Sequence, residues 1–136
     1  MPLHLEIVTP EKKIFSDMVA NVYLPGADGE MGILPQHSAL VTALAPGELR
    51  YEKDGKVFPM AIGSGFAEVT QEKVCILTDM ALGDEQIDEA MAEAAIKRAE
   101  EQLKSIDHSV DAEEVAHLQA IIAKSLAQLR LKRRPH

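Results

Sequence analysis

Hydrophobic and polar residues follow two different patterns along this 136-residue chain, and the change falls near Gly83. Before that point, short apolar runs alternate with glycine and proline, which mark turns. In several runs, residues two apart share their polarity, as Val22 and Leu24 do, and this period is typical of β-strands. The pattern predicts strands at residues 3–8, 19–24, 38–43, 48–52, 56–62, 66–69 and 74–77.

Turn signals indicate how these strands are connected. All eight glycines and six of the seven prolines lie within the first 84 residues. Asp54-Gly55 stands between two predicted strands, and Asp-Gly is a strong signal for a tight hairpin turn. Many short strands at regular spacing favour a sandwich over alternating strands and helices. We therefore predict an all-β sandwich domain over residues 1–84.

The residues after Gly83 have a helical pattern. Residues 85–134 contain no glycine or proline and are rich in strong helix formers. Apolar residues at spacings of mostly three and four predict a helix from about Asp84 to Ser105, with the stripe Ile87, Met91, Ala94, Ala95, Ala99, Leu103 and Ile106. Asp111, followed three residues later by Glu114, indicates the start of a second helix. It should end near Lys132 and carry the stripe Val115, Leu118, Ile122, Leu126 and Leu129.

A break at residues 107–109 separates the two predicted helices. So short a connection implies an antiparallel hairpin over residues 85–136. The expected fold class is thus α+β, an N-terminal all-β sandwich followed by a C-terminal two-helix hairpin. Both helices are rich in alanine, which buries little apolar area and stabilises weakly at roughly 25 cal/mol per Å². Such a hairpin could detach and rearrange.

Charge is segregated along the hairpin. Residues 85–114 carry ten acidic and three basic side chains, whereas the remainder has no acid and five basic residues, which we call the basic arm: Lys124, Arg130, Lys132, Arg133 and Arg134. The basic arm is a candidate to dock on an acidic partner surface. Equally, it could be a solvated tail that complements the negative end of the helix. Charge alone leaves both interpretations open.

Composition excludes several classes of protein. The net charge of −8 argues against general nucleic-acid binding. Cys75, as the single cysteine, cannot form an internal disulfide, which fits a reducing compartment. No apolar run approaches the ~20 residues that span a bilayer, and the N-terminus lacks the features of a signal peptide.

Few residues suggest catalysis or metal binding. The histidines do not have the spacing of zinc ligands; they are His4, His37, His108, His117 and His136. Gly63-Ser64-Gly65 is too short for a nucleophile elbow, and no phosphate loop is present. We therefore expect a protein that is not an enzyme and holds no metal.

The segment 25–38 combines three glycines and two prolines with an apolar triplet. One interpretation is a tight loop that reverses the chain between sheets. Another is a rigid loop that presents Met31, Ile33 and Leu34 to a partner, since loops on rigid scaffolds often bind. The residues themselves favour the first.

This segment resembles the signature of the epsilon-subunit family of rotary F-type ATP synthases, whose mitochondrial equivalent is called delta. The family pattern runs Pro-Gly, two variable residues, Gly-Glu/Asp, an apolar residue, Gly-Ile/Leu-Leu-Pro, one variable residue, His-Ser/Ala, and residues 25–38 meet it. Residues 5–10, 65–69 and 116–131 also resemble the family. The likeness covers nearly the whole chain in order.

The resemblance implies a non-catalytic subunit of the central stalk, with the sandwich joining the gamma subunit to the membrane-embedded c-ring. Membrane contact would be peripheral, through the complex, and the start at Met1 without a transit peptide favours the cytoplasmic face of a bacterial inner membrane. By resemblance, gamma and the c-ring would be met by Glu30, Met31, Gly32, Ile33, Leu34, Pro35, His37 and Ser38.

The resemblance also gives the hairpin a regulatory role. It would either fold against the sandwich or extend beside gamma into the alpha and beta catalytic subunits. The extended hairpin would block rotation and so inhibit ATP hydrolysis. The basic arm would then face acidic segments of the catalytic subunits.

Some members of the family bind ATP on the folded hairpin through Ile/Leu-Asp, two variable residues and Arg-Ala. The matching residues here would be Ile87, Asp88 and Ala92, with Arg98 and Arg130 as further charges, but Met91 replaces the arginine. A thioether cannot donate to phosphate as a guanidinium does. We expect weak or absent ATP binding and no cofactor. Two rivals remain, an adaptor unconnected to the synthase and a nucleotide-sensing switch.

Overall fold

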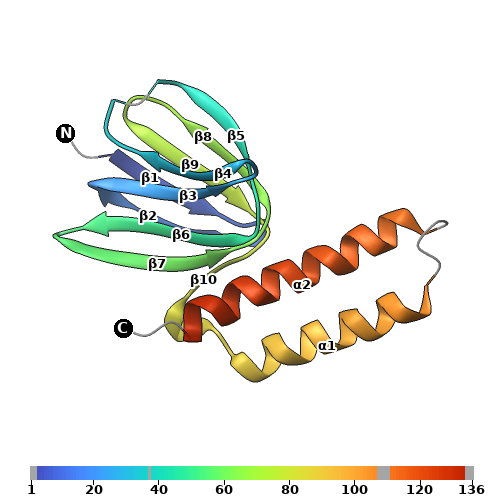
Figure 1. Cartoon of the computed structure of the whole chain (residues 1–136). Coiled ribbons are helices and arrows are strands. Elements are labelled where there is room, and N and C mark those ends of the chain that lie inside the picture. Colours follow the sequence, from blue (N-terminus) through green and yellow to red (C-terminus); the bar gives the residue numbers. More distant parts are fainter. Residues whose placement is uncertain (1–2, 37, 107–110, 134–136) are drawn as a thin grey trace.

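The computed structural model describes residues 3–36, 38–106 and 111–133. A β-rich body is followed by two antiparallel helices that lie along one end of it (Figure 1). The predicted α+β fold class is confirmed. The described residues form ten strands: β1 (Leu3–Val8), β2 (Lys13–Val19), β3 (Asn21–Gly26), β4 (Gly29–Ile33), β5 (Leu40–Leu44), β6 (Gly47–Lys53), β7 (Lys56–Ile62), β8 (Gly65–Val69), β9 (Lys73–Thr78) and β10 (Ala81–Gly83).

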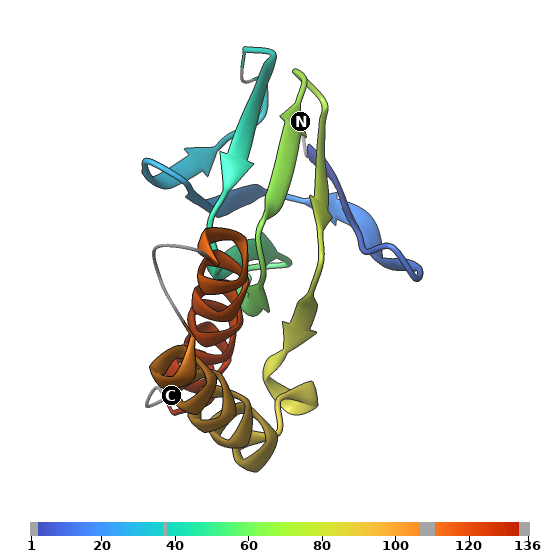
Figure 2. The same ribbon diagram turned by 90° about the vertical axis from the view of Figure 1, so that its right-hand side faces the viewer.

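The strands hydrogen-bond in the order β10-β7-β6-β3-β5-β8-β9-β1-β2, and β4 pairs with β3. Neighbours are antiparallel except β1 and β9, which are parallel. The sheet curls until its layers face one another (Figure 2), and β2 comes to lie beside β6 through an ion pair between Asp17 and Lys53. This closure encloses the apolar core, as a sandwich requires.

The period of two explains the core. In β1, Leu3, Leu5 and Ile7 are completely buried, while His4 and Glu6 between them face outward. The other strands add the remaining large, fully buried side chains of this core, which are Leu24, Ile33, Leu49, Ile62, Ile76, Val19 and Val22.

Three strands were missing from the prediction, namely β2, β4 and β10. Alternation is weak in β2, where Val19 is the only fully buried residue. Gly29 and Gly32 made β4 look like part of a loop, and β10 has only three residues. The strand predicted over 19–24 corresponds to β3 with shifted bounds, because β2 ends at Val19 and β3 runs from Asn21 to Gly26.

The predicted hairpin turn at Asp54-Gly55 is confirmed. Both residues have positive φ, 54° and 78°, and they connect β6 to β7 directly because Lys53 pairs with Lys56. Two successive positive φ angles match the twist of the flanking strands, and glycine adopts this conformation without a steric cost.

The helices are α1 (Glu89–Ser105) and α2 (Ala112–Arg133). The expectation that the first helix starts near Asp84 is wrong. Residues 84–86 form a single 3₁₀ turn, η1, and α1 begins after Asp88, whose carboxylate accepts a hydrogen bond from the Met91 amide at 3.1 Å. A side-chain acceptor at this position caps a helix N-terminus. The predicted break at 107–109 lies outside the described residues.

The buried residues of α1 also differ from the predicted stripe. Met91 is 71% exposed and Ala94 is exposed, whereas Ala92 and Ala99 are buried. The predicted stripe is therefore wrong at two positions. In α2 the stripe holds, with Leu118 and Leu129 buried and its other members half-buried.

The second helix lies between α1 and the sandwich (Figure 1). It packs on α1 with one face and on β6 and β7 with another. Leu131 of α2, fully buried, meets Ala61 of β7 and Ile87 of the connection. The position of the hairpin therefore depends on a small apolar cluster.

Candidate partner-binding surfaces

The segment singled out in the sequence forms the β3–β4 hairpin and the loop that follows it. Val22 pairs with Ile33 and Tyr23 with Gly32. A Cβ atom on Gly32 would lie 3.0 Å from the Tyr23 ring, so glycine lets that ring cross the neighbouring strand. The Arg50 guanidinium lies 5.2 Å from the centre of the Tyr23 ring and 3.0 Å from the Glu30 carboxylate.

Burial corrects the idea that this segment presents its whole apolar triplet to a partner. Ile33 is completely buried and belongs to the core, and Met31 is half-buried against it. Leu34, by contrast, is 58% exposed. Glu30, Gly32 and Ser38 are also exposed, Pro35 lines a cavity of about 510 Å³ together with Met18, and His37 lies outside the described residues.

A second surface was missed by the sequence analysis. Ala43 of β5 pairs with Phe66 of β8, which pairs in turn with Leu77 of β9. Phe66 is 56% and Leu77 42% exposed, and Val41 on the same strand as Ala43 is 68% exposed. We call Val41, Ala43, Phe66 and Leu77 the apolar row. The sequence does show these residues as apolar side chains at positions where the strand alternation predicts exposure. Only the pairing of β5, β8 and β9 brings the four residues together.

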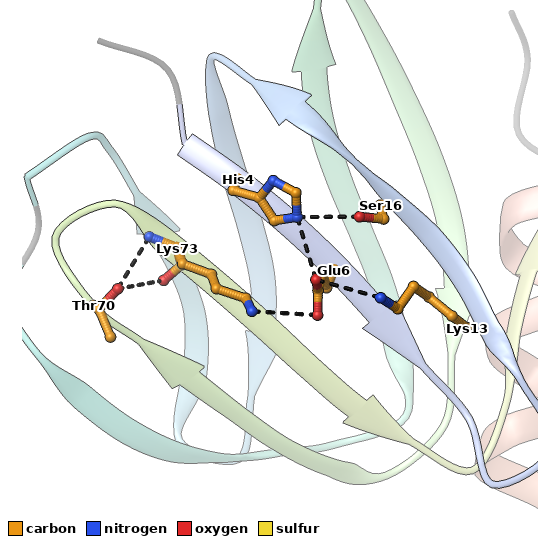
Figure 3. A network of polar contacts seen from close by, with 6 residues as sticks. All are labelled: His4, Glu6, Lys13, Ser16, Thr70 and Lys73. Atoms are coloured by element: carbon orange, nitrogen blue, oxygen red, sulfur yellow. Dashed lines mark hydrogen bonds and ion pairs between the residues drawn. The ribbon is translucent and has the colours of Figure 1, made fainter.

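A network of charged side chains lies near the apolar row. Figure 3 shows the Glu6 carboxylate among His4, Lys13 and Lys73, at 3.3, 3.5 and 3.4 Å. Burial by itself would raise the pKa of Glu6, but the positive charges of Lys13 and Lys73 hold that pKa below its ordinary value. Glu6 is thus an ionised, well-partnered carboxylate, and the network is a structural feature of the outer face.

Cys75 pairs with Glu6 across β1 and β9. Burial, helped by the charge of Glu6, raises the pKa of the Cys75 thiol. A protonated thiol is a poor nucleophile, so this raised pKa gives no support to a reactive cysteine.

The basic arm contacts this chain itself. Lys124 Nζ lies 3.5 Å from Asp79 Oδ2, and Lys132 Nζ donates to the Asp84 carbonyl at 3.1 Å. Arg133 pairs with Glu93 and, at 3.5 Å, with Glu89. Arg130 is exposed beside a cavity of about 470 Å³ between α2 and β6, and Arg134 lies outside the described residues.

The residues of the possible ATP site do not all come together. Ile87 and Ala92 are buried, and the Asp88 carboxylate is used as the cap of α1. Arg98 stands ten residues beyond Asp88, about 15 Å along a helix at 1.5 Å per residue. Met91, in the place of the motif arginine, is exposed. Weak or absent binding of ATP stays a prediction that these contacts do not test.

Among the described residues, no group of three or more His, Cys, Asp or Glu side chains is arranged to hold a metal ion. Within the same part of the chain, neither helix has the length and apolar character needed to cross a bilayer.

This chain combines a β-sandwich, a helical hairpin and an exposed apolar row, and exposed apolar surface of this kind is typical of proteins that bind a partner. The model of the family "ATP synthase, Delta/Epsilon chain, beta-sandwich domain" matches residues 2–83. The chain therefore belongs to the delta/epsilon family of ATP synthase subunits, which are accessory subunits of an enzyme complex, and the resemblance stated from the sequence is confirmed.

Relatives resemble the chain over most of its length. The ATP synthase epsilon chain of Herpetosiphon aurantiacus is 42% identical over 98% of this chain and 99% of its own. That of Desulforamulus reducens is 49% identical over 79% of this chain and 81% of its own.

Chains in two solved ATP synthase structures are similar to this chain. A chain in the mitochondrial ATP synthase of Euglena gracilis, in an assembly of OSCP, F1 and c-ring, is 30% identical and has a TM-score of 0.74, with 92% of this chain and 79% of that chain covered. A central-stalk and c-ring structure from Tetrahymena thermophila contains a chain of the same fold, with 12% identity, a TM-score of 0.54, and 64% of this chain and 70% of that chain covered.

Proposed function

We propose that the chain is a central-stalk subunit that couples gamma to the c-ring and has no catalytic residues of its own. The apolar row carries this proposal. Phe66 and Leu77 are large apolar side chains exposed on neighbouring strands, and contiguous apolar surface of this kind marks a protein interface. The similar Euglena chain comes from an assembly that contains F1 and the c-ring, which supports gamma, the c-ring and the catalytic subunits as partners. The bacterial relatives support a place on the cytoplasmic face of a bacterial membrane.

Within this proposal the two surfaces have separate partners. The apolar row would bind gamma, because large apolar side chains exposed side by side on a sheet are stabilised when a partner covers them. The β3–β4 hairpin and its loop, with Glu30 and Leu34 exposed, would meet the c-ring and the foot of gamma. Phe66→Ser should weaken binding to gamma without unfolding the chain, because Phe66 is already 56% exposed. Unchanged affinity for gamma in a pull-down or calorimetric titration would contradict this assignment.

The hairpin is proposed to inhibit ATP hydrolysis when it leaves the sandwich and extends into the catalytic head. Two observations support this role: the hairpin is attached to the sandwich through the small apolar cluster around Leu131, and its basic arm is positively charged. The decisive measurement compares the ATPase rate of a gamma-containing catalytic head with the full chain and with a chain stopped at Asp84. The sandwich keeps its own closed core without the hairpin, so the shorter chain is expected to bind.

If both chains bind and only the full chain slows hydrolysis, the hairpin is the inhibitory arm. Slowing by neither would leave the sandwich as a coupling element and contradict the inhibitory role. Failure of both to bind would contradict the stalk function.

Weak or absent ATP binding is part of the same proposal. Titration calorimetry of the full chain with ATP should give little heat, and a micromolar dissociation constant would overturn this expectation. Met91→Arg should raise any residual affinity, because it restores a planar donor for phosphate.

A further inference from the structure

Three basic residues of α2 are bound to acidic or carbonyl oxygens of this same chain. Lys124 meets Asp79, Lys132 meets the Asp84 carbonyl, and Arg133 meets Glu89 and Glu93. These partners come from the β9–β10 connection, from η1 and from the first turns of α1. The folded hairpin thus surrounds part of the basic arm with negative groups.

The contact of Lys124 with Asp79 is shaped by a glycine of the sandwich. A Cβ atom on Gly63 would lie 1.8 Å from Asp79 Oδ1 and 3.2 Å from Lys124 Cδ. Only the missing side chain lets the carboxylate and the lysine stem lie over this buried backbone position. The Asp79 amide also donates to the Ser64 carbonyl at 3.3 Å, which fixes the aspartate beside the glycine. The sandwich therefore presents a formed site for one lysine of α2.

The apolar part of the same interface is small. Leu131 packs on Ala61 and Ile87, with Met80 and Leu82 half-buried around them. Gln128 Nε2 lies 2.9 Å from the Met80 sulfur. Next to these contacts a cavity of about 470 Å³ is left between α2 and β6. Because α2 and β6 do not pack closely along this groove, the polar contacts act together with the Leu131 cluster in holding the hairpin docked.

We propose that Asp79, with the Asp84 carbonyl, Glu89 and Glu93, acts as an internal substitute for an acidic partner. While the hairpin is docked, these groups occupy Lys124, Lys132 and Arg133. The hairpin can offer those side chains to an acidic surface of another subunit only after it breaks the internal contacts. Docking and inhibition thus compete for the same three basic residues. This inference rests on the proposed inhibitory function of the hairpin.

Asp79 and Lys124 allow a test in which the two ends of one contact give opposite results. Either Asp79→Asn or Lys124→Gln removes the ion pair and should favour release of the hairpin. Asp79→Asn keeps the whole basic arm, whereas Lys124→Gln removes one of its charges. Asp79→Asn should therefore strengthen inhibition, and Lys124→Gln should not.

Release is measured first, on the full chain by itself. Ala127 of α2 is 6% exposed and lines the cavity against β6, so Ala127→Cys, in a Cys75→Ser background, reports undocking through its rate of modification by a thiol reagent. Both test variants should raise this rate about two- to fivefold, as expected for the loss of one exposed ion pair. Added salt should raise the rate of the parent more than that of either variant. Lys97→Gln, at an exposed position of α1, is the matched control and should leave the rate unchanged.

Inhibition is then measured as the ATPase rate of a gamma-containing catalytic head with each chain, without the reporter cysteine. Stronger inhibition by Asp79→Asn together with weaker inhibition by Lys124→Gln supports the competition. Unchanged modification rates in both variants overturn it, because the contact then does not hold the hairpin. Faster modification with equal inhibition by both variants also overturns it. If the full chain slows the ATPase no more than the chain stopped at Asp84 does, the proposed inhibitory function itself has failed. The modification rates still show separately whether the docking contact exists.

Discussion

At the scale of single residues, two neighbours in the sequence differ completely in burial and therefore in structural role. Ile33 and Leu34 are adjacent and chemically similar, yet Ile33 is completely buried and Leu34 is 58% exposed. The difference arises because Ile33 ends β4, paired with Val22, and successive side chains of a strand point to opposite faces. One residue therefore supports the core and the next is available to a partner.

Ile33→Ala should lower the free energy of unfolding by about 2–5 kcal/mol, the usual cost of emptying a buried aliphatic site. Leu34→Ala should change that free energy by less than about 0.5 kcal/mol, as surface substitutions do, but should weaken binding to the partner of this loop. Urea denaturation measures the changes in stability, and a binding titration measures the change in affinity. A large loss of stability in Leu34→Ala would show that Leu34 is packed after all.

Gly65→Ala is expected to destabilise the sandwich by about 1–3 kcal/mol, the range found for overpacking. A Cβ atom there would lie 1.9 Å from the Leu77 carbonyl oxygen, and backbone cannot move aside as a flexible side chain can. Gly83→Ala is the matched control, because its Cβ would meet nothing closer than 3.8 Å. Equal urea midpoints for the two variants would contradict the predicted clash.

At the scale of elements, pairing between distant strands turns single residues into surfaces. The apolar row exists because β5, β8 and β9 are neighbours in the sheet. In the same way, β2 and β6 are far apart in the sequence, but Asp17 and Lys53 join them where the sandwich closes. The hydrogen bond from Lys53, reinforced by that of the Met18 amide, holds the pKa of Asp17 below its ordinary value of 3.8. The same bond raises the pKa of Lys53 above 10.5.

This pair predicts a pH dependence of stability. Since the folded pKa of Asp17 is lowered, its stabilising effect is fully present above pH 3.8 and is lost as the pH falls through the lowered value. Since the folded pKa of Lys53 is raised, its effect is present below pH 10.5 and is lost as the pH rises through the raised value. Asp17→Asn should therefore lower the urea midpoint at neutral pH, and the difference from the parent should shrink well below pH 3.8. A difference that stays constant with pH would contradict this role.

At the scale of the whole molecule, the sandwich and the hairpin differ in how firmly they are held. The sandwich has a core of large, fully buried side chains, whereas α1 buries only Ala92 and Ala99 among its described residues. The hairpin reaches the sandwich through α2, as Figure 1 shows. Two parts of one chain with such different burial are expected to open separately.

Amide hydrogen exchange should therefore proceed faster in α1 and α2 than in β1, β3 and β9 of the isolated chain. The central strands should exchange only on global unfolding. Leu131→Ala should speed exchange in α2 and leave the central strands unchanged, because it removes the apolar anchor of the hairpin without entering the core of the sandwich. Equal protection in helices and strands would contradict separate opening.

Much of this organisation was readable from local patterns. The β-hairpin turn at Asp54-Gly55, the antiparallel helices and the stripe of α2 follow from periodicity and turn chemistry, which act over a few residues. The signature of residues 25–38 led to the family, which the comparisons confirm. Local patterns failed at β2 and β4, where strand pairing overrode weak alternation and glycine.

The sequence by itself determined the fold class, the charge of the hairpin and the family, because these depend on residue types and short spacings. Only the tertiary structure decided that Ile33 is core, that Phe66 and Leu77 form one surface, and that Lys124 rests on Asp79 beside Gly63. The physical reason is that these interactions join residues far apart in the sequence. Pairing of distant strands and docking of a helix depend on how the whole chain closes and buries its apolar residues, which no short stretch of sequence specifies.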